Sequence, residues 1–157
     1  MTRAFLSLGS NLGDRAAYLR DAVAALEGTG ELVACSAVYE TEPIGGPEDQ
    51  GAFLNLVVEL RTAKEPLELL AACQELEQAA RRERLVHHGP RTLDVDVLTY
   101  ADAVSDDPVL TLPHPRMRER RFVLVPLAEL APELVEPAWL EAAVGDLERL
   151  GMLSDVS

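Results

Sequence analysis

The stretch that decides the fold is "TLDVDVLTY", residues 92–100, in which apolar and charged side chains alternate. In a β-strand, successive side chains point to opposite faces of the sheet. One face of this strand would carry Leu93, Val95 and Val97, and the other would carry Asp94 and Asp96. The two carboxylates would lie about 7 Å apart, at roughly 3.3 Å per residue. Asp is a poor strand former and like charges on one face repel, so the pair indicates a function rather than a contribution to stability.

Length and composition predict one folded domain spanning residues 1–157. The chain has 48% hydrophobic and 26% charged residues, which is typical of a globular protein with a real core. It contains no apolar run of membrane-spanning length and no basic-then-apolar signal peptide after Met1, so we expect a cytoplasmic protein that does not bind membranes. Cys35 and Cys73 are far apart in sequence and form no CxxC pair, so we expect free thiols.

The charge of the chain is strongly acidic but unevenly distributed. A net charge of −13 argues against nucleic acid as a partner. Eight of the 14 basic residues are arginines in two short clusters that bracket the Asp strand: Arg81, Arg82, Arg84 and Arg91, and then Arg116, Arg118, Arg120 and Arg121. A single arginine is more often helix surface charge, but its planar fork also suits bidentate contacts with phosphate. Two clusters around an acidic strand therefore favour a polyanion site.

The hydrophobic periodicity predicts an alternation of strands and helices. Strands are expected at residues 3–9, 32–40, 52–60, 92–100 and, briefly, 109–115; helices are expected from the Asp14 cap to about 26, at 65–84, within 120–132 and at 139–150. The order strand–helix–strand–strand–helix–strand is typical of an α+β, ferredoxin-like βαββαβ fold. We expect an antiparallel sheet with helices on one face, a helical C-terminal extension, and a site on the open face.

The Asp pair favours a magnesium site. Two carboxylates held close attract a hard cation, which relieves their repulsion and completes its shell with waters and substrate phosphates. Asp-x-Asp alone is weak evidence, but here it follows "GPRT" and the Arg-rich end of a helix. Nothing matches the GxxxxGK[ST] phosphate loop or the kinase GxGxxG loop, so a nucleotide would have to bind in another way.

Four motifs in order resemble one enzyme family. They are "SLGSNLGD" (7–14), "YETEPIGGPEDQGAFLN" (39–55), "GPRTLDVDVL" (89–98) and "LPHPRMRERRFVLVPLAELAPEL" (112–134). Over nearly its whole length the chain resembles the 6-hydroxymethyl-7,8-dihydropterin pyrophosphokinases of folate biosynthesis. The resemblance implies the ferredoxin-like fold and a monomer. It also implies transfer of an intact pyrophosphoryl group from ATP to the pterin hydroxymethyl oxygen, with release of AMP.

The resemblance also implies a role for each matching residue. The catalytic residues would be Arg82, Arg91, Asp94 and Asp96, with Asp94 and Asp96 holding two Mg²⁺ ions. The ATP-binding residues would be Leu70, Gln74, Glu77, Arg82, Arg84, His87, Arg91, Val97, Thr111, His114 and Arg120. The pterin-binding residues would be Thr41, Glu42, Ile44, Phe53, Asn55, His88 and Phe122. The chemistry fits independently, because a flat, amide-rich ring suits two aromatic faces and one side-chain amide. Alternatively, either Phe is an ordinary core residue, and His114 between two prolines is a turn residue.

The chain departs from the family pattern at two places. His87 and His88 stand where the family usually has Arg-Trp, and Pro115 stands where it often has an aromatic residue. We interpret the two histidines as weaker substitutes for a phosphate contact and a stacking ring. Two other functions remain open: a non-catalytic ferredoxin-like ligand-binding module, and a Mg²⁺-dependent phosphohydrolase that uses the same Asp pair. Pterin-dependent formation of AMP separates all three.

Overall fold

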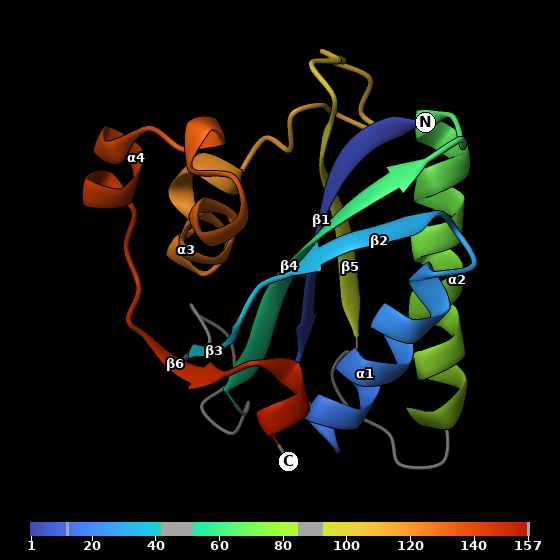
Figure 1. The fold of residues 1–157 in the computed structure, drawn as a ribbon, viewed down its shortest axis with the longest axis horizontal. Helices are drawn as coiled ribbons and strands as arrows, with labels where there is room; N and C mark the ends of the chain where they lie inside the picture. The colour runs from blue at the N-terminus through green and yellow to red at the C-terminus, as the bar shows by residue number, and fades with distance from the viewer. Residues whose placement is uncertain (12, 42–51, 85–92, 157) are drawn as a thin grey trace.

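The computed structural model describes residues 1–11, 13–41, 52–84 and 93–156, without the side chains of 82–84. The strands are β1 (Thr2–Ser10), β2 (Glu31–Cys35), β3 (Val38–Thr41), β4 (Phe53–Thr62), β5 (Asp94–Tyr100) and β6 (Leu147–Gly151). The helices are α1 (Arg15–Leu26), α2 (Pro66–Arg84), α3 (Arg121–Leu130) and α4 (Pro137–Ala142), with short 3₁₀ turns at Met117–Glu119, Pro132–Leu134 and Leu153–Asp155. Figure 1 shows α1 and α2 on one side of the sheet and α3 and α4 on the other. No described helix combines the length and apolarity that crossing a bilayer requires.

The sheet has the strand order β5-β1-β4-β3-β6, and β2 also pairs with β4. Every one of these pairs is antiparallel. The first five strands with α1 and α2 reproduce the ferredoxin-like arrangement, so the predicted fold class is confirmed. β1 lies between β5 and β4, which brings the Asp strand within two strands of Asn55.

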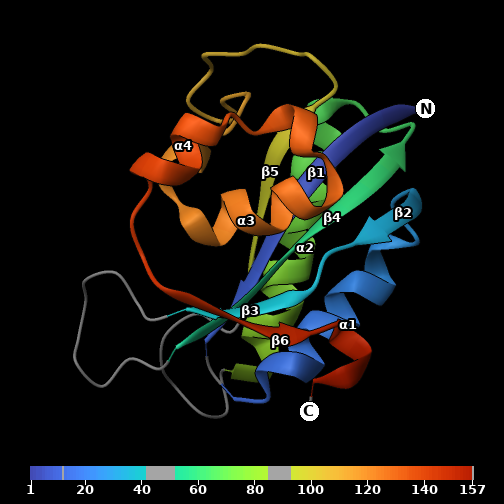
Figure 2. The ribbon, with the colours of Figure 1, turned by 60° about the vertical axis from the view of Figure 1, so that its left-hand side comes forward.

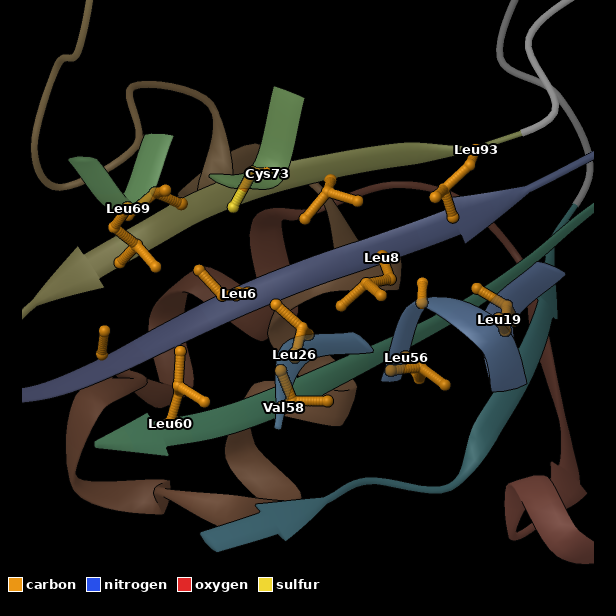
Figure 3. Packing of buried hydrophobic residues seen from close by; sticks show 14 of the residues in the cluster. Leu6, Leu8, Leu19, Leu26, Leu56, Val58, Leu60, Leu69, Cys73 and Leu93 are labelled. Carbon is orange, nitrogen blue, oxygen red and sulfur yellow. The ribbon is translucent and has the colours of Figure 1, made fainter. Parts of the chain in front are cut away.

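Each face of the sheet has its own hydrophobic cluster. The larger cluster packs α1 and α2 against one face, through side chains such as Leu6, Leu8, Leu19 and Leu69 (Figure 3). The smaller cluster packs α3 against the opposite face at one end of the strands; it includes Phe5, Val57, Leu98, Leu124 and Leu127. Figure 2 shows α3 and α4 over this second face. The sequence analysis expected this second face to be open, but α3 covers part of it.

The predicted strand at 32–40 is interrupted at Ser36. The backbone N–H of Ser36 donates to the carbonyl of Val57 at 2.9 Å, and the Ser36 hydroxyl accepts from the N–H of Val57 at 2.9 Å. The Ser36 hydroxyl thus accepts a hydrogen bond that a backbone carbonyl would accept in a regular strand pair. This interrupts the pairing, so β2 and β3 pair with β4 separately.

The C-terminal expectations were wrong in detail. The last helix ends at Ala142 rather than near residue 150, because the backbone becomes extended at Ala143, with a φ of −70° and a ψ of 143°, and the φ of 114° at Gly145 is also incompatible with a helix. Residues 147–151 instead form β6, which satisfies the otherwise open edge of β3. Residues 109–115 contribute a single bridge between Leu112 and Ser105 rather than a strand, since Pro113 and Pro115 have no N–H to donate to a ladder.

Candidate active site

A cavity of about 460 Å³ opens on the α3 side of the sheet, a size that suits a small-molecule ligand. Its lining residues come from β1, β3, β4, β5 and the segment from the first 3₁₀ turn to beyond α4. They are Ser7, Gly9, Thr41, Phe53, Asn55, Asp94, Asp96, Arg116, Glu119, Arg120, Phe122 and Val144. Seven of them, namely Thr41, Phe53, Asn55, Asp94, Asp96, Arg120 and Phe122, are among the residues predicted from the sequence.

The strand register builds the floor of the cavity. Gly9 pairs with Asp94 on one side and with Asn55 on the other, and Ser7 pairs with Asp96. Directly opposed residues of antiparallel strands share a face, so the acidic side chains and the amide lie on the same surface. A Cβ atom at Gly9 would come within 2.8 Å of Asn55 Oδ1. The glycine therefore leaves the space that the Asn55 amide occupies.

Asn55 and the two phenylalanines form the less charged end of the cavity. Asn55 is 3% exposed, and its Nδ2 donates to Thr41 Oγ1 at 2.9 Å. Because an amide offers two donors and an acceptor, capacity remains for a ligand. Phe53 and Phe122 are half-buried and both line the cavity, and Phe122 also packs against the smaller hydrophobic cluster. The Arg120 guanidinium lies 5.6 Å from the centroid of the Phe122 ring.

The Asp pair lies on the cavity side of β5, as the alternation predicts. Leu93, Val95 and Val97 are 5%, 3% and 3% exposed in the large core cluster, whereas Asp94 and Asp96 are half-buried at the cavity. Within the described residues, no group of three or more His, Cys, Asp or Glu side chains is arranged to hold a metal. Two carboxylates fit Mg²⁺, which commonly takes one or two from the protein and its remaining ligands from water and phosphate.

His114 is fixed beside the acidic end. Its backbone N–H donates to the Leu98 carbonyl at 2.8 Å, and its Nδ1 accepts from the backbone N–H of Arg116 at 3.2 Å. Burial lowers the pKa of His114, an effect that the charge of Asp96 opposes and the charges of Arg120 and Arg116 reinforce. The imidazole is therefore neutral at pH 7, with its proton on Nε2, and can act as a hydrogen-bond donor.

The structure divides the second arginine cluster into two pairs. Arg116 and Arg120 line the cavity. Arg118 instead stacks on Trp139 with its guanidinium 4.6 Å from the ring centroid, and Arg121 Nη1 donates to the Gly145 carbonyl at 3.1 Å. Only the first pair is placed to contact a ligand of this cavity.

Several cavity residues were missed by the sequence analysis. Arg116 belonged to a recognised cluster, and Ser7 and Gly9 to a recognised motif, but neither signal singled them out. Glu119 also belonged to a recognised motif, whereas Val144, which is 69% exposed, lies outside all four motifs. At the end of β1, Ser10 and Asn11 are buried and their side-chain polar atoms have no hydrogen-bond partner among the described residues.

Other predicted ATP contacts lie away from the cavity. Val97 belongs to the large core cluster, Leu70 packs against it, and Gln74 is exposed on α2. Glu77 Oε2 accepts the Val95 N–H at 3.0 Å, and Thr111 Oγ1 donates to the Asp107 carbonyl at 3.0 Å. Their roles in binding ATP remain predictions. Predicted residues outside the described structure are Glu42, Ile44, His87, His88 and Arg91, together with the side chains of Arg82 and Arg84.

Comparisons with known proteins agree on one family. A family model described as 7,8-dihydro-6-hydroxymethylpterin-pyrophosphokinase matches residues 5–132. A Bacillus subtilis protein named 2-amino-4-hydroxy-6-hydroxymethyldihydropteridine pyrophosphokinase is 45% identical over 137 residues, covering 86% of this chain and 81% of the relative. A protein of the same name from Methylorubrum extorquens is 51% identical over 137 residues, covering 86% of each chain.

Solved structures support the fold. The crystal structure of a Plasmodium falciparum HPPK-DHPS triple mutant with pteroate superposes with a TM-score of 0.64 at 16% identity, covering 81% of this chain. The chain spans 39% of the length of that solved protein. At this identity the similarity supports the arrangement of strands and helices alone.

Proposed function

Because the chain belongs to the 7,8-dihydro-6-hydroxymethylpterin-pyrophosphokinase family, we propose that its cavity binds ATP and 6-hydroxymethyl-7,8-dihydropterin and transfers pyrophosphate between them. The products are AMP and the pterin pyrophosphate, an intermediate of folate biosynthesis. The observation that carries the proposal is the juxtaposition, in one cavity, of a ring-binding end around Asn55 and an acidic end around Asp94 and Asp96.

The ring-binding end suits the pterin. Asn55 presents donor and acceptor groups to the edge of an amide-rich heterocycle, and Thr41 fixes the orientation of its amide. Phe53 and Phe122 come from different elements, β4 and α3, and offer aromatic faces for stacking. The pterin hydroxymethyl group would then point toward β5, where the phosphates bind.

The acidic end suits ATP only together with cations. The charged lining residues among those described are three carboxylates, Asp94, Asp96 and Glu119, and two guanidiniums, Arg116 and Arg120. A polyphosphate would be repelled by this balance unless metal ions neutralised the Asp pair. We therefore propose a requirement for Mg²⁺, with two ions held by Asp94 and Asp96. Bound Mg²⁺ supplies electrostatic stabilisation of the phosphate oxygens.

The residues of the chain bind and orient rather than form a covalent intermediate. The hydroxymethyl oxygen forms a bond to the β-phosphorus of ATP and releases its proton to solvent, and the bond from that phosphorus to the oxygen of AMP breaks. Arg116 and Arg120, which line the cavity, would neutralise phosphate oxygens as charge shifts toward AMP, and the neutral His114 would donate its Nε2–H to a phosphate oxygen. Since Nδ1 of His114 already accepts a hydrogen bond, this histidine acts as a donor in the proposal and not as a base.

The organisation of the chain is part of the proposal. All 157 residues would form one pyrophosphokinase domain, which the pairing of β6 with β3 in the common sheet supports. We propose that the enzyme acts as a monomer in the cytoplasm.

The direct test is a product assay with ATP, Mg²⁺ and the reduced pterin alcohol. AMP should appear only when the pterin is present, in equal amount to the pterin pyrophosphate, and chelation of divalent ions should stop the reaction. Release of phosphate or pyrophosphate from ATP without the pterin would instead support the phosphohydrolase. Binding of ligands without consumption of ATP would support a non-catalytic module.

A further inference from the structure

Arg15, the first residue of α1, connects two strands of the sheet. Its Nη1 donates to the carbonyl oxygen of Ala52 at 2.8 Å, and its Nη2 lies 3.0 Å from Glu40 Oε2. Both charged side chains of this ion pair are about one-third exposed. One guanidinium thus holds a backbone group next to β4 and a side chain of β3.

These contacts lie at the end of the β3–β4 hairpin. The last described pairs of this hairpin are Glu40 with Leu54 and Thr41 with Phe53. Strand ends that are joined by a long connection separate more easily than strand centres, because fewer hydrogen bonds hold them. A bridge from a third element restrains both strands at this position.

The restrained residues belong to the proposed pterin site. Thr41 and Phe53 line the cavity, and Thr41 accepts the hydrogen bond that orients the Asn55 amide. A relative shift of the two strand ends would therefore move the ring-stacking side chain and the amide together. Because reactive geometry is sensitive to shifts of about 1 Å, such a displacement would weaken pterin binding.

Arg15 is not needed to anchor its own helix. Ala16, Leu19, Ala22 and Leu26 bury the inner face of α1, and Asp14 Oδ1 caps the helix by accepting the Ala17 N–H at 3.1 Å. Within the described residues, the polar contacts of the Arg15 side chain go to the hairpin, and a partly exposed ion pair contributes little to global stability.

We propose that Arg15 is a positioning residue for the pterin: by bridging Glu40 and Ala52 it holds Thr41, Phe53 and Asn55 in the geometry that receives the ring. This inference rests on the proposed function. It assigns Arg15 no contact with either substrate.

The test compares Arg15→Ala with Arg20→Ala. Arg20 lies on the same helix and also donates to one carbonyl, that of Val156 at 2.7 Å, away from the cavity. In Arg15→Ala we expect the KM for the pterin to rise about tenfold, while the KM for ATP and the melting temperature stay close to those of Arg20→Ala. Arg15→Lys should recover part of the pterin affinity, since an ammonium can keep the pair with Glu40.

Hydrogen exchange of residues 38–41 and 53–55 without substrates separates this inference from the proposed function. Exchange should be faster in Arg15→Ala than in the wild type or Arg20→Ala. A wild-type protein that forms no pterin-dependent AMP would overturn the proposed function, yet the exchange measurement would still test the bridge.

Unchanged exchange, or an unchanged KM for the pterin despite faster exchange, would overturn the positioning role. If Arg15→Ala does not fold, Glu40→Gln must raise the KM for the pterin, and an unchanged value there also overturns the inference.

Discussion

Replacing Gly9 by Ala tests the floor of the active site with a single methyl group. The added Cβ would lie 2.8 Å from Asn55 Oδ1 and 3.6 Å from Phe53 Cδ1. Gly9 is in a regular strand and is not among the glycines with positive φ, so the backbone accepts Ala and the effect comes from crowding alone. An ordinary carbon–oxygen contact is longer by about half an ångström or more, so the Asn55 amide must move.

That movement disturbs a buried hydrogen bond. Asn55 Nδ2 donates to Thr41 Oγ1 at 2.9 Å, and a shift of about half an ångström would lengthen the bond beyond the normal range. A net hydrogen bond is worth about 0.5–1.5 kcal/mol and overpacking costs about 1–3 kcal/mol. Together these costs are about 1.5–4.5 kcal/mol, so at about 2–4 °C per kcal/mol for a chain of this size the melting temperature should fall by about 3–18 °C. Displacing the amide should raise the KM for the pterin about tenfold, which corresponds to ~1.4 kcal/mol.

The matched control is Gly28→Ala. A Cβ atom there would approach the Ala25 carbonyl oxygen no closer than 3.4 Å, an ordinary contact, and should stabilise the fold by about 0.4–1 kcal/mol. Thermal unfolding and pterin-dependent AMP formation for the two variants are the measurements. If Gly9→Ala keeps the wild-type KM for the pterin while its melting temperature falls, Asn55 does not bind the pterin and the assignment of this end of the cavity fails.

Three further predictions concern the Asp pair, the second arginine cluster and a buried thiol. Asp96→Ala should lower turnover on the order of a thousandfold, because metal stabilisation of phosphate charge is worth several kcal/mol, with little change in melting temperature; Leu93→Ala, on the core face, should cost about 2–5 kcal/mol of stability and keep most of the turnover of folded protein. Arg116→Ala should raise the KM for ATP, whereas Arg118→Ala should cost about 0.5–1 kcal/mol of stability through its lost aromatic stack and leave the KM unchanged. Burial raises the pKa of Cys35 from 9.0 to about 11, so the unfolded thiol ionises at a lower pH than the folded one, and stability should fall as pH rises from about 9 through 11. Urea unfolding at several alkaline pH values should show a shallower fall for Cys35→Ala; an equal slope would contradict this cause.

A strand or helix can be predicted from the sequence when its own hydrophobic periodicity specifies its conformation and its buried face. In β5 the two-residue period identifies the core face and the cavity face before any partner is known, and the burial of Leu93, Val95 and Val97 confirms it. β6 has no such pattern, since the five residues of "LERLG" do not alternate between apolar and polar side chains. Its conformation depends on the unpaired edge of β3, a segment over 100 residues earlier in the chain, so local propensity could not reveal it.

In the candidate site, too, some residues could be predicted from local sequence and others are placed by tertiary packing. The motifs predicted Asn55 and Phe122 as ring-binding residues, because amide and aromatic side chains fit a flat heterocycle, and the structure brings both to the cavity. Motifs could not distinguish Arg116 from Arg118, which are two residues apart in one arginine cluster. The 3₁₀ turn at Met117–Glu119 decides which guanidinium faces the cavity and which stacks on Trp139. Such a turn is determined by packing against the rest of the protein, and no local sequence pattern predicts it.

The energetics of β5 explain why a strand can carry two carboxylates on one face. Two charges about 7 Å apart repel by about 0.6 kcal/mol in water and about 2.4 kcal/mol at an effective dielectric constant of 20. On the other face, burial of each of Leu93, Val95 and Val97 contributes about 1.5–3 kcal/mol. Leu98 is buried in the smaller cluster, on the same side of the sheet as the Asp pair. β5 is an edge strand, and the Glu77 carboxylate satisfies the outward N–H of Val95. The core face therefore stabilises β5 by more than the Asp pair destabilises it, so this strand can present two carboxylates at the cavity without losing its own structure.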